Sequence, residues 1–127
     1  MVQNATIVAI TGSRYWGEDR HFVAITKRLD SLSRATVIVL GDARGVDSIA
    51  RAVATSLGFA DIRRHIADWG AFGRRAGPIR NRAMLDENPQ LVLAFHDDLA
   101  NSRGTKDMIQ AATRRGIPVE IITGEEE

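Results

Sequence analysis

The sequence contains no cysteine and no long apolar run. The missing thiol excludes disulfides, thiolate catalysis and cysteine-ligated zinc. No apolar stretch approaches the roughly 20 residues that cross a bilayer, and the first residues lack the basic and apolar regions of a secretory signal. We therefore expect a cytoplasmic protein without a membrane partner, in which packing alone supplies the stability.

An excess of charge of one sign is also lacking, and lysine is scarce. The 17 basic and 16 acidic residues give a net charge of +1. This balance argues against a polyanion-binding surface, so nucleic acid is an unlikely partner. Only two basic residues are lysines, Lys27 and Lys106, which leaves 17 − 2 = 15 arginines. Arginine suits phosphate and base contacts, although genomic codon bias would give the same composition.

Histidines are few and scattered. His21, His65 and His96 have no mutual spacing typical of metal ligands. We expect no metal site and no cofactor. His65 is expected to be structural, whereas His96 is a candidate for ligand contact or acid–base work.

The chain has 127 residues, of which 44% are hydrophobic and 26% charged. This length and composition suit a single soluble domain with one core. Disorder is expected only in the acidic tail, residues 124–127.

Short apolar segments alternate with longer amphipathic ones. We expect strands at residues 6–10, 36–40, 62–66, 91–95 and 119–122, with four helix-sized segments between them. Gly58 and Gly116 should end two of the helices. The alternation predicts an α/β fold: a single Rossmann-like three-layer domain, with a five-stranded parallel sheet and helices on both faces.

Composition also predicts the strand order. Strands one, two and four are almost wholly apolar, as central strands should be, whereas strands three and five carry charge. Order 3-2-1-4-5 satisfies this and places a topological switch point between strands one and four. The loops after strands one, two and four should then share one cleft.

The loops after strands one and two contain glycines suited to an anion. Gly12 lets the backbone approach a ligand, and Ser13 and Arg14 offer a hydroxyl and a guanidinium, although a plain turn has the same pattern. Residues 41–47, GDARGVD, precede the most clearly amphipathic helix and form a candidate anion cradle with Gly41, Arg44 and Gly45. Asp47 either caps that helix, which is the stronger expectation, or binds a ribose hydroxyl.

Two further segments complete the expected cleft. Pro78 suits the first turn of a helix and places Arg80 and Asn81 near its start. In residues 96–107, Ser102 or Thr105 should cap the next helix, with Arg103 and Gly104 beside them. Trp69 and Phe72 could stack on a base, but packing is the stronger expectation. The expected ligand-binding residues are Gly12, Ser13, Arg14, Gly41, Arg44, Gly45, Asp47, Arg80, Asn81, Ser102, Arg103, Gly104 and Thr105.

Taken together, four segments carry a resemblance to a known superfamily. They are GSR at 12–14, GDARGVD at 41–47, RRAGPIRN at 74–81 and SRGTKDM at 102–108. Over residues 6–122 the chain resembles the SLOG superfamily of Rossmann-like domains, most closely its YspA-like (YpsA-related) branch. The resemblance implies a homo-oligomer that binds nucleotides or nucleotide-derived molecules, with residues 41–47 and 102–107 lining the phosphate and sugar site.

Relatives within that superfamily suggest two alternative functions. LOG enzymes cleave the base–ribose bond of nucleoside monophosphates, and DprA proteins bind single-stranded DNA. The LOG motif PGGxGTxxE is reduced here to Gly104-Thr105, with Met108 at the position of its glutamate. We expect binding of a nucleotide-derived, phosphate-bearing ligand. The alternatives are hydrolysis of an N-glycosidic or phosphoester bond, with Asp47 or Asp107 as catalytic candidates, and single-stranded nucleic-acid binding through arginines and Trp16 or Trp69.

Overall fold

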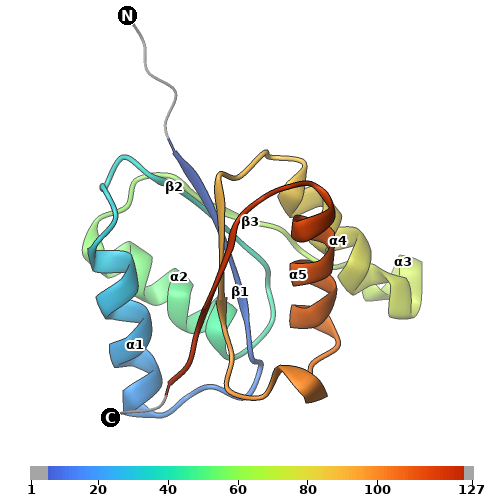
Figure 1. The fold of residues 1–127 in the computed structure, drawn as a ribbon, viewed down its shortest axis with the longest axis horizontal. Coiled ribbons are helices and arrows are strands. Elements are labelled where there is room, and N and C mark those ends of the chain that lie inside the picture. The colour runs from blue at the N-terminus through green and yellow to red at the C-terminus, as the bar shows by residue number, and fades with distance from the viewer. Residues whose placement is uncertain (1–5, 125–127) are drawn as a thin grey trace, which may run out of the picture.

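The computed structural model describes residues 6–124 as alternating strands and helices (Figure 1). The strands are β1 (Ile7–Gly12), β2 (Val37–Leu40), β3 (Ile62–Arg64), β4 (Leu91–Phe95) and β5 (Val119–Ile122). The longer helices are α1 (Asp19–Asp30), α2 (Val46–Leu57), α4 (Ala76–Leu85) and α5 (Gly104–Arg114). Three shorter segments complete the chain: α3 (Trp69–Phe72) and two 3-10 turns, η1 (Gly73–Arg75) and η2 (Leu99–Asn101).

All five strands form one parallel sheet in the order β3-β2-β1-β4-β5, which confirms the predicted fold class and strand order. In its centre, Ile10 of β1 is in register with Leu40 of β2 and Leu93 of β4. Helices α1 and α2 cover one face, and α4 and α5 cover the other (Figure 1). The crossovers change face after β3, so the connections that leave the neighbouring strands β1 and β4 lead to opposite faces of the sheet, which makes this position a topological switch point.

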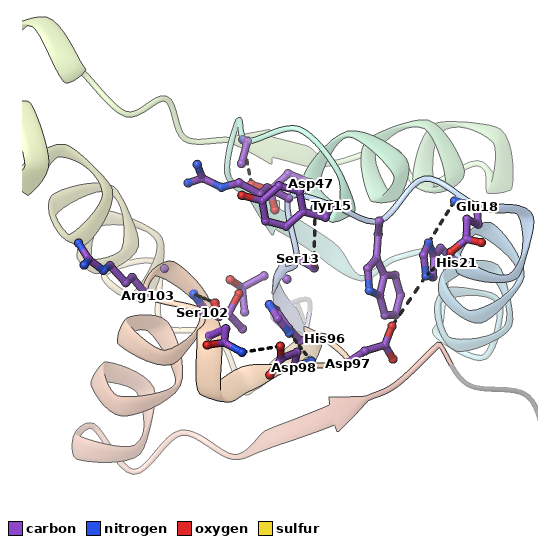
Figure 2. Close-up of a pocket in the computed structure, with 18 of the residues that line it drawn as sticks. Ser13, Tyr15, Glu18, His21, Asp47, His96, Asp97, Asp98, Ser102 and Arg103 are labelled. Carbon is purple, nitrogen blue, oxygen red and sulfur yellow. Dashed lines mark hydrogen bonds and ion pairs between the residues drawn. The ribbon is translucent and has the colours of Figure 1, made fainter.

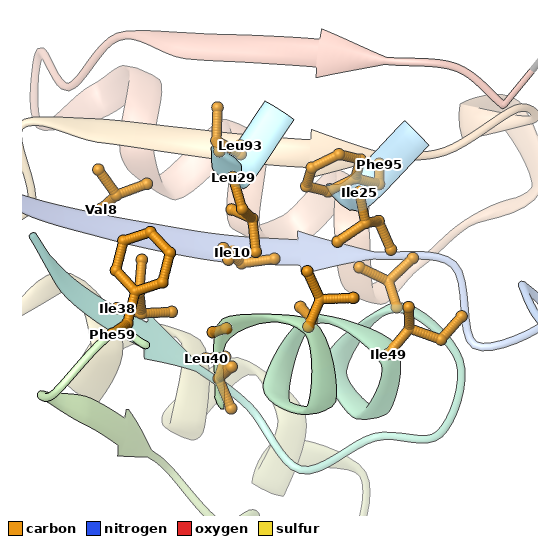
Figure 3. Close-up of a cluster of buried hydrophobic side chains, with 14 of the residues drawn as sticks. Val8, Ile10, Ile25, Leu29, Ile38, Leu40, Ile49, Phe59, Leu93 and Phe95 are labelled. Atoms are coloured by element: carbon orange, nitrogen blue, oxygen red, sulfur yellow. The ribbon is translucent and has the colours of Figure 1, made fainter. Parts of the chain in front are cut away.

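Successive side chains of the central strands enter two separate cores. Those facing α1 and α2 pack with Ile25, Leu29 and Ile49 of these helices (Figure 3). Those facing α4 and α5 pack with Met84 and Met108. Covering both faces explains why the three central strands are apolar at almost every position. The first set is Val8, Ile10, Ile38, Leu40, Leu93 and Phe95, and the second includes Ala9, Val37, Val39 and Val92.

Several element boundaries follow local sequence features. Gly58 ends α2 in the left-handed conformation, with φ +91°, as expected for a helix carboxyl cap. Gly116, with φ +73°, directly follows the last turn of α5. Pro78 is the third residue of α4, within its first turn. At the edge, β3 keeps only three of the five expected residues, because it pairs with β2 alone and exposes Arg63 and Arg64.

The carboxyl-terminal segment differs from the expectation at Gly124. This residue is buried: its N–H donates to Asp97 Oδ1 over 2.7 Å, and its carbonyl accepts from Arg20 Nη1 over 2.9 Å. These two bonds fix a residue that we assigned to the disordered tail, and residues 125–127 lie outside the described part of the chain. Within residues 6–124, no helix has both the length and the apolar character to span a membrane.

Candidate functional site

A cleft of about 590 Å³ opens at the carboxyl ends of β1 and β4. It lies at the topological switch point, where the sequence predicted it. The segments after β1, β2 and β4 reach it together, joined by one side chain from α4 (Figure 2). The expected site residues that line it are Gly12, Ser13, Arg14, Asp47, Arg80, Ser102, Arg103, Gly104 and Thr105.

The loop after β1 is packed tightly against β4. A Cβ at Gly12 would lie 2.4 Å from the carbonyl oxygen of Phe95 and 2.7 Å from a methyl of Val46, so only glycine fits there. The Ser13 N–H donates to that same carbonyl over 3.0 Å. The Ser13 hydroxyl accepts from the Tyr15 N–H over 3.1 Å. These contacts form a turn that leaves the exposed Arg14 and Tyr15 at the cleft.

The loop after β2 is locked to the loop after β1. Gly45 has φ +78°, and a Cβ there would lie 2.3 Å from the Ser13 carbonyl oxygen. That oxygen accepts from the Val46 N–H over 2.9 Å, so the amide at the first turn of α2 is already bonded. Gly41, Arg44 and Gly45 are absent from the cleft lining, to which this segment contributes Ala43 and Asp47. The Arg44 guanidinium instead lies 5.7 Å from the centre of the Tyr15 ring.

Asp47 is a buried carboxylate in the lining of the cleft. Its Oδ2 accepts from the Ala43 N–H over 3.0 Å, which closes the turn before α2 without capping an amide of the helix. Burial raises the pKa of Asp47 to about 6, and this effect outweighs the opposing influences of the Ala43 hydrogen bond and the Arg80 charge. Gly41 leaves room for the carboxylate, since a Cβ there would lie 2.7 Å from Oδ2.

Arg80 reaches the cleft from α4 with part of its hydrogen-bonding capacity unused. Its Nη1 donates to Asp42 Oδ1 over 3.0 Å, and its Nη2 to Asn81 Oδ1 over 3.4 Å. Its Nε is buried and donates to no atom of residues 6–124. The guanidinium is thus held in place by protein groups while its buried Nε–H is left without an acceptor.

Asn81 and Asp107 lie behind the cleft rather than in it. The buried Asn81 donates through Nδ2 to the Gly104 carbonyl over 3.3 Å and to Asp107 Oδ2 over 3.0 Å. Asp107 also accepts from Arg82 Nη1 over 2.8 Å. This network ties α4 to the start of α5 and keeps Asp107 out of the cleft lining. Of the two catalytic candidates, Asp47 alone lines the cleft.

The start of α5 and the residue pair before it line the cleft. Ser102 Oγ accepts from the Thr105 N–H over 3.1 Å, so Ser102 makes the capping hydrogen bond that we assigned to Ser102 or Thr105. The Thr105 side chain is buried, whereas Arg103 and Gly104 are exposed. The four residues form the edge of the cleft nearest to the positive end of the helix dipole.

Sequence reasoning missed one end of the cleft, where Glu18, Arg20, His21 and Asp97 lie. His21 is 3% exposed, and its Nδ1 accepts from the N–H groups of Gly17 and Glu18 over 3.0 and 3.1 Å. Burial, followed by the Arg20 charge, lowers the pKa of this imidazole. The spacing Glu18-x-x-His21 at a helix start was the available sign of this arrangement.

Two further residues after β4, His96 and Asp98, also line the cleft. Asp98 follows Asp97, and its N–H donates to Nδ1 of His96 over 2.8 Å. Burial lowers the pKa of His96 as well. The acidic pair directly after a central strand was visible in the sequence, and its proximity to α1 was not.

The aromatic residues behave differently from the expectation. Trp16 is only 6% exposed and stacks on His21 with ring centres 4.4 Å apart, so it is not free to stack on a base. Trp69 and Phe72 are 53% and 47% exposed, so the preference for packing was wrong. Both lie outside the cleft lining, which instead includes Tyr15.

Comparison with known proteins supports the fold and shows the family. No protein-family model matches the chain. The structure is similar to that of DNA processing protein A (DprA) from Streptococcus pneumoniae, with a TM-score of 0.74 and 20% identity. The match covers 92% of this chain and 50% of the DprA chain, so the present chain spans half the length of that protein. At this identity the similarity shows a shared Rossmann-like fold.

A sequence relative is considerably more similar. The Gene 61 protein of Mycobacterium phage D29 is 39% identical over 118 residues, which cover 88% of this chain and 92% of the relative. An identity of this size over nearly the full length of both proteins requires common descent. The chain belongs to the family of the Gene 61 protein of Mycobacterium phage D29.

Proposed function

We propose that the chain binds a nucleotide or a nucleotide-derived, phosphate-bearing ligand in the cleft between β1 and β4. The observation that carries this proposal is the convergence of Arg14, Arg80, Arg103 and the start of α5 on one cavity, where a fourth arginine, Arg20, is already paired with Glu18. Arg80 pairs with Asp42, whereas Arg14 and Arg103 form no ion pair with any carboxylate of residues 6–124. Free guanidinium groups beside a helix amino terminus suit a phosphate.

The shape of the cleft supports a ligand larger than phosphate alone. Its volume of about 590 Å³ lies within the range of roughly 300–1,000 Å³ of small-molecule sites. Tyr15 is 79% exposed at the cleft and offers a ring face on which a base could stack. A phosphate at α5 and a base on Tyr15 would belong to one nucleotide, with its sugar between them.

The four sequence segments that resemble the YspA-like branch of the SLOG superfamily support the same ligand class. Each of the four contributes to the lining of the cleft. The residues are Arg14, Asp47, Arg80 and Arg103. Membership of that branch is part of the proposal. So is a homo-oligomeric state, which sedimentation equilibrium would test.

Calorimetry with a panel of nucleotides tests the proposal. We expect at least one nucleotide to bind and inorganic phosphate to compete with it. The affinity of Arg103→Gln for that nucleotide should be about 10-fold lower. Arg114→Gln is the matched control, because it removes the same charge from the exposed far end of the same helix. No binding across the panel, or equal losses in both variants, would overturn the proposal. Mass spectrometry of a denatured extract would identify a ligand that copurifies.

Hydrolysis of the bound nucleotide is the second candidate, favoured by Asp47. A carboxyl group whose pKa is raised to about 6 by burial is partly protonated near neutral pH and could act as a general acid. Release of free base or phosphate from nucleoside monophosphates, lost in Asp47→Asn with ligand binding retained, would establish turnover. Binding without product would reject it.

Binding of single-stranded nucleic acid is the third candidate. The fold shared with a DNA processing protein favours it, as do the exposed Trp69 and Phe72 next to Arg74 and Arg75. The near-zero net charge weighs against it. An oligothymidylate titration at several salt concentrations tests it, because neutralising phosphates must produce a salt-dependent affinity. A bound fraction that is absent or independent of salt would dismiss it.

A further inference from the structure

The two ends of the cleft differ in charge. Arg103 and Ser102 lie at one end, and Glu18, His21 and Asp97 at the other (Figure 2). At the second end, Arg20 Nη2 donates to Glu18 over 3.1 Å. Asp97 forms no pair with an arginine or lysine of residues 6–124: it contacts the Gly124 N–H and lies near the His21 ring. This end is unsuited to a second phosphate, because the carboxylates repel it.

His21 supplies an unused hydrogen-bond donor at the same end. Its Nδ1 accepts from two backbone N–H groups, so the proton of the neutral ring must lie on Nε2. Nε2 is buried and donates to no atom of residues 6–124. It lies 3.8 Å from Glu18 Oε2 and 3.8 Å from Asp97 Oδ2, too far for a hydrogen bond to either. A buried donor without an acceptor is unfavourable, so the site is incomplete as it stands.

These surroundings define the group that would complete the site. A phosphate only accepts hydrogen bonds, and an ammonium only donates them. A hydroxyl does both: it can accept from His21 Nε2 and donate to Asp97 Oδ2. Trp16 stacks on the His21 ring and Gly124 packs against it, so the approach to Nε2 that we expect lies on the side of Glu18, whose side chain is 68% exposed and can rotate. A second, neighbouring hydroxyl would then lie beside the Glu18 carboxylate.

We infer that Glu18, His21 and Asp97 form a subsite for the vicinal hydroxyls of a ribosyl group whose phosphate lies at the amino terminus of α5. The inference rests on the proposed function and narrows it to ribose-containing ligands. One end of the cleft then binds the phosphate of a ribosyl phosphate, and the other end binds its hydroxyls.

Comparison of ribonucleotides with deoxyribonucleotides tests the inference on the full chain. Calorimetry would use the pairs AMP and dAMP, and CMP and dCMP, with inorganic phosphate as the reference anion. We expect each ribonucleotide to bind about 10-fold more tightly than its deoxy partner, because the missing hydroxyl leaves a buried donor and a carboxylate unsatisfied. Phosphate should compete equally with both members of a pair.

Variants of the two carboxylates separate the subsite from the phosphate site. Asp97→Asn and Glu18→Gln should bring the ribose preference close to 1-fold while phosphate competition persists. Glu18 is exposed, so its variant remains informative if Asp97→Asn disturbs the bond to Gly124. Asp86→Asn is the control, because it removes a carboxylate that pairs with Arg115 outside the cleft.

The outcomes distinguish the two proposals. A preference for ribose that Asp97→Asn and Glu18→Gln abolish and Asp86→Asn preserves supports the subsite. Equal affinity for ribo and deoxy partners, or a preference that survives both variants, overturns the subsite and leaves nucleotide binding intact. Absence of both nucleotide and phosphate binding overturns the proposed function together with the subsite.

Discussion

At the scale of single residues, Asp47 is a carboxylate kept almost entirely from water. Its pKa of about 6 lies above the ordinary value of 3.8, so the folded chain binds this proton more tightly than the unfolded chain does. By linkage, ionisation of Asp47 lowers the free energy of unfolding above pH 6, and this loss becomes smaller as the pH falls toward 3.8. A group that lowers stability at neutral pH and lines the cleft is a candidate for selection on function.

Asp47→Asn should therefore stabilise the protein. The amide oxygen can still accept from the Ala43 N–H, and no charge is buried. We expect the free energy of unfolding to rise by about 2 kcal/mol at pH 7, and by less than half of that at pH 4.5. Urea unfolding at the two pH values measures the difference. A gain that is the same at both would contradict a buried, ionised carboxylate.

Gly45 tests whether the loops after β1 and β2 depend on backbone contact. A Cβ there meets the Ser13 carbonyl oxygen at 2.3 Å, in a backbone conformation with φ +78°. Gly45→Ala should lower the free energy of unfolding by about 3 kcal/mol or more. Gly58→Ala is the control, because its φ of +91° is also positive but no atom of residues 6–124 lies within 4 Å of the added Cβ. It should cost only about 1 kcal/mol. Equal losses of unfolding free energy in denaturant titrations would show that the positive φ alone, and not the contact with Ser13, causes the strain.

At the scale of elements, the pairing of α4 with α5 sets the position of the amino terminus of α5. Asn81→Ala removes three hydrogen bonds from a side chain that is 2% exposed: two that it donates and one that it accepts from Arg80. We expect a loss of about 2 kcal/mol, since the Gly104 carbonyl and Asp107 lose a buried partner. Arg82→Met breaks a half-exposed ion pair with the same Asp107 and should cost below about 1 kcal/mol. Chemical denaturation ranks the two variants, and the reverse order would refute a structural role for Asn81.

The sequence predicts these elements well where one physical pattern dominates. Strand β4 has its expected bounds, and the apolar character of β1, β2 and β4 correctly predicts their central positions. The stretch after β3 is harder to predict, because α3 and η1 bury none of their own residues and so leave no apolar periodicity.

The residues of the cleft were likewise predictable in part. Loops that follow apolar strands could be placed on one rim, which explains the correct grouping of Ser13, Arg14 and Arg103. Long-range packing could not be inferred: the contact of Gly45 with Ser13 spans two loops, and the approach of His21 to Asp97 joins α1 to the segment after β4. Such contacts depend on three-dimensional spacing that no local pattern encodes.

At the scale of the whole molecule, the sheet should open from its edges. Side chains of β1, β2 and β4 are buried between two helical layers, whereas Arg63 and Arg64 of β3 and Ile121 of β5 are exposed. Amides of the three central strands should exchange with an opening free energy close to that of global unfolding, and those of β3 and β5 with a lower one. Hydrogen exchange measured by NMR gives both values. Exchange of β1 as fast as that of β3 would contradict a centrally stabilised sheet.

The positions of Thr6 and Gly124 have a practical consequence for how the chain is handled. Thr6 enters β1 at the rim of the sheet opposite the cleft, whereas Gly124 is bonded to Asp97 and Arg20, beside the candidate sugar subsite. Because Gly124 lies beside the candidate subsite and Thr6 lies at the far rim, we choose an amino-terminal affinity tag for every titration described above.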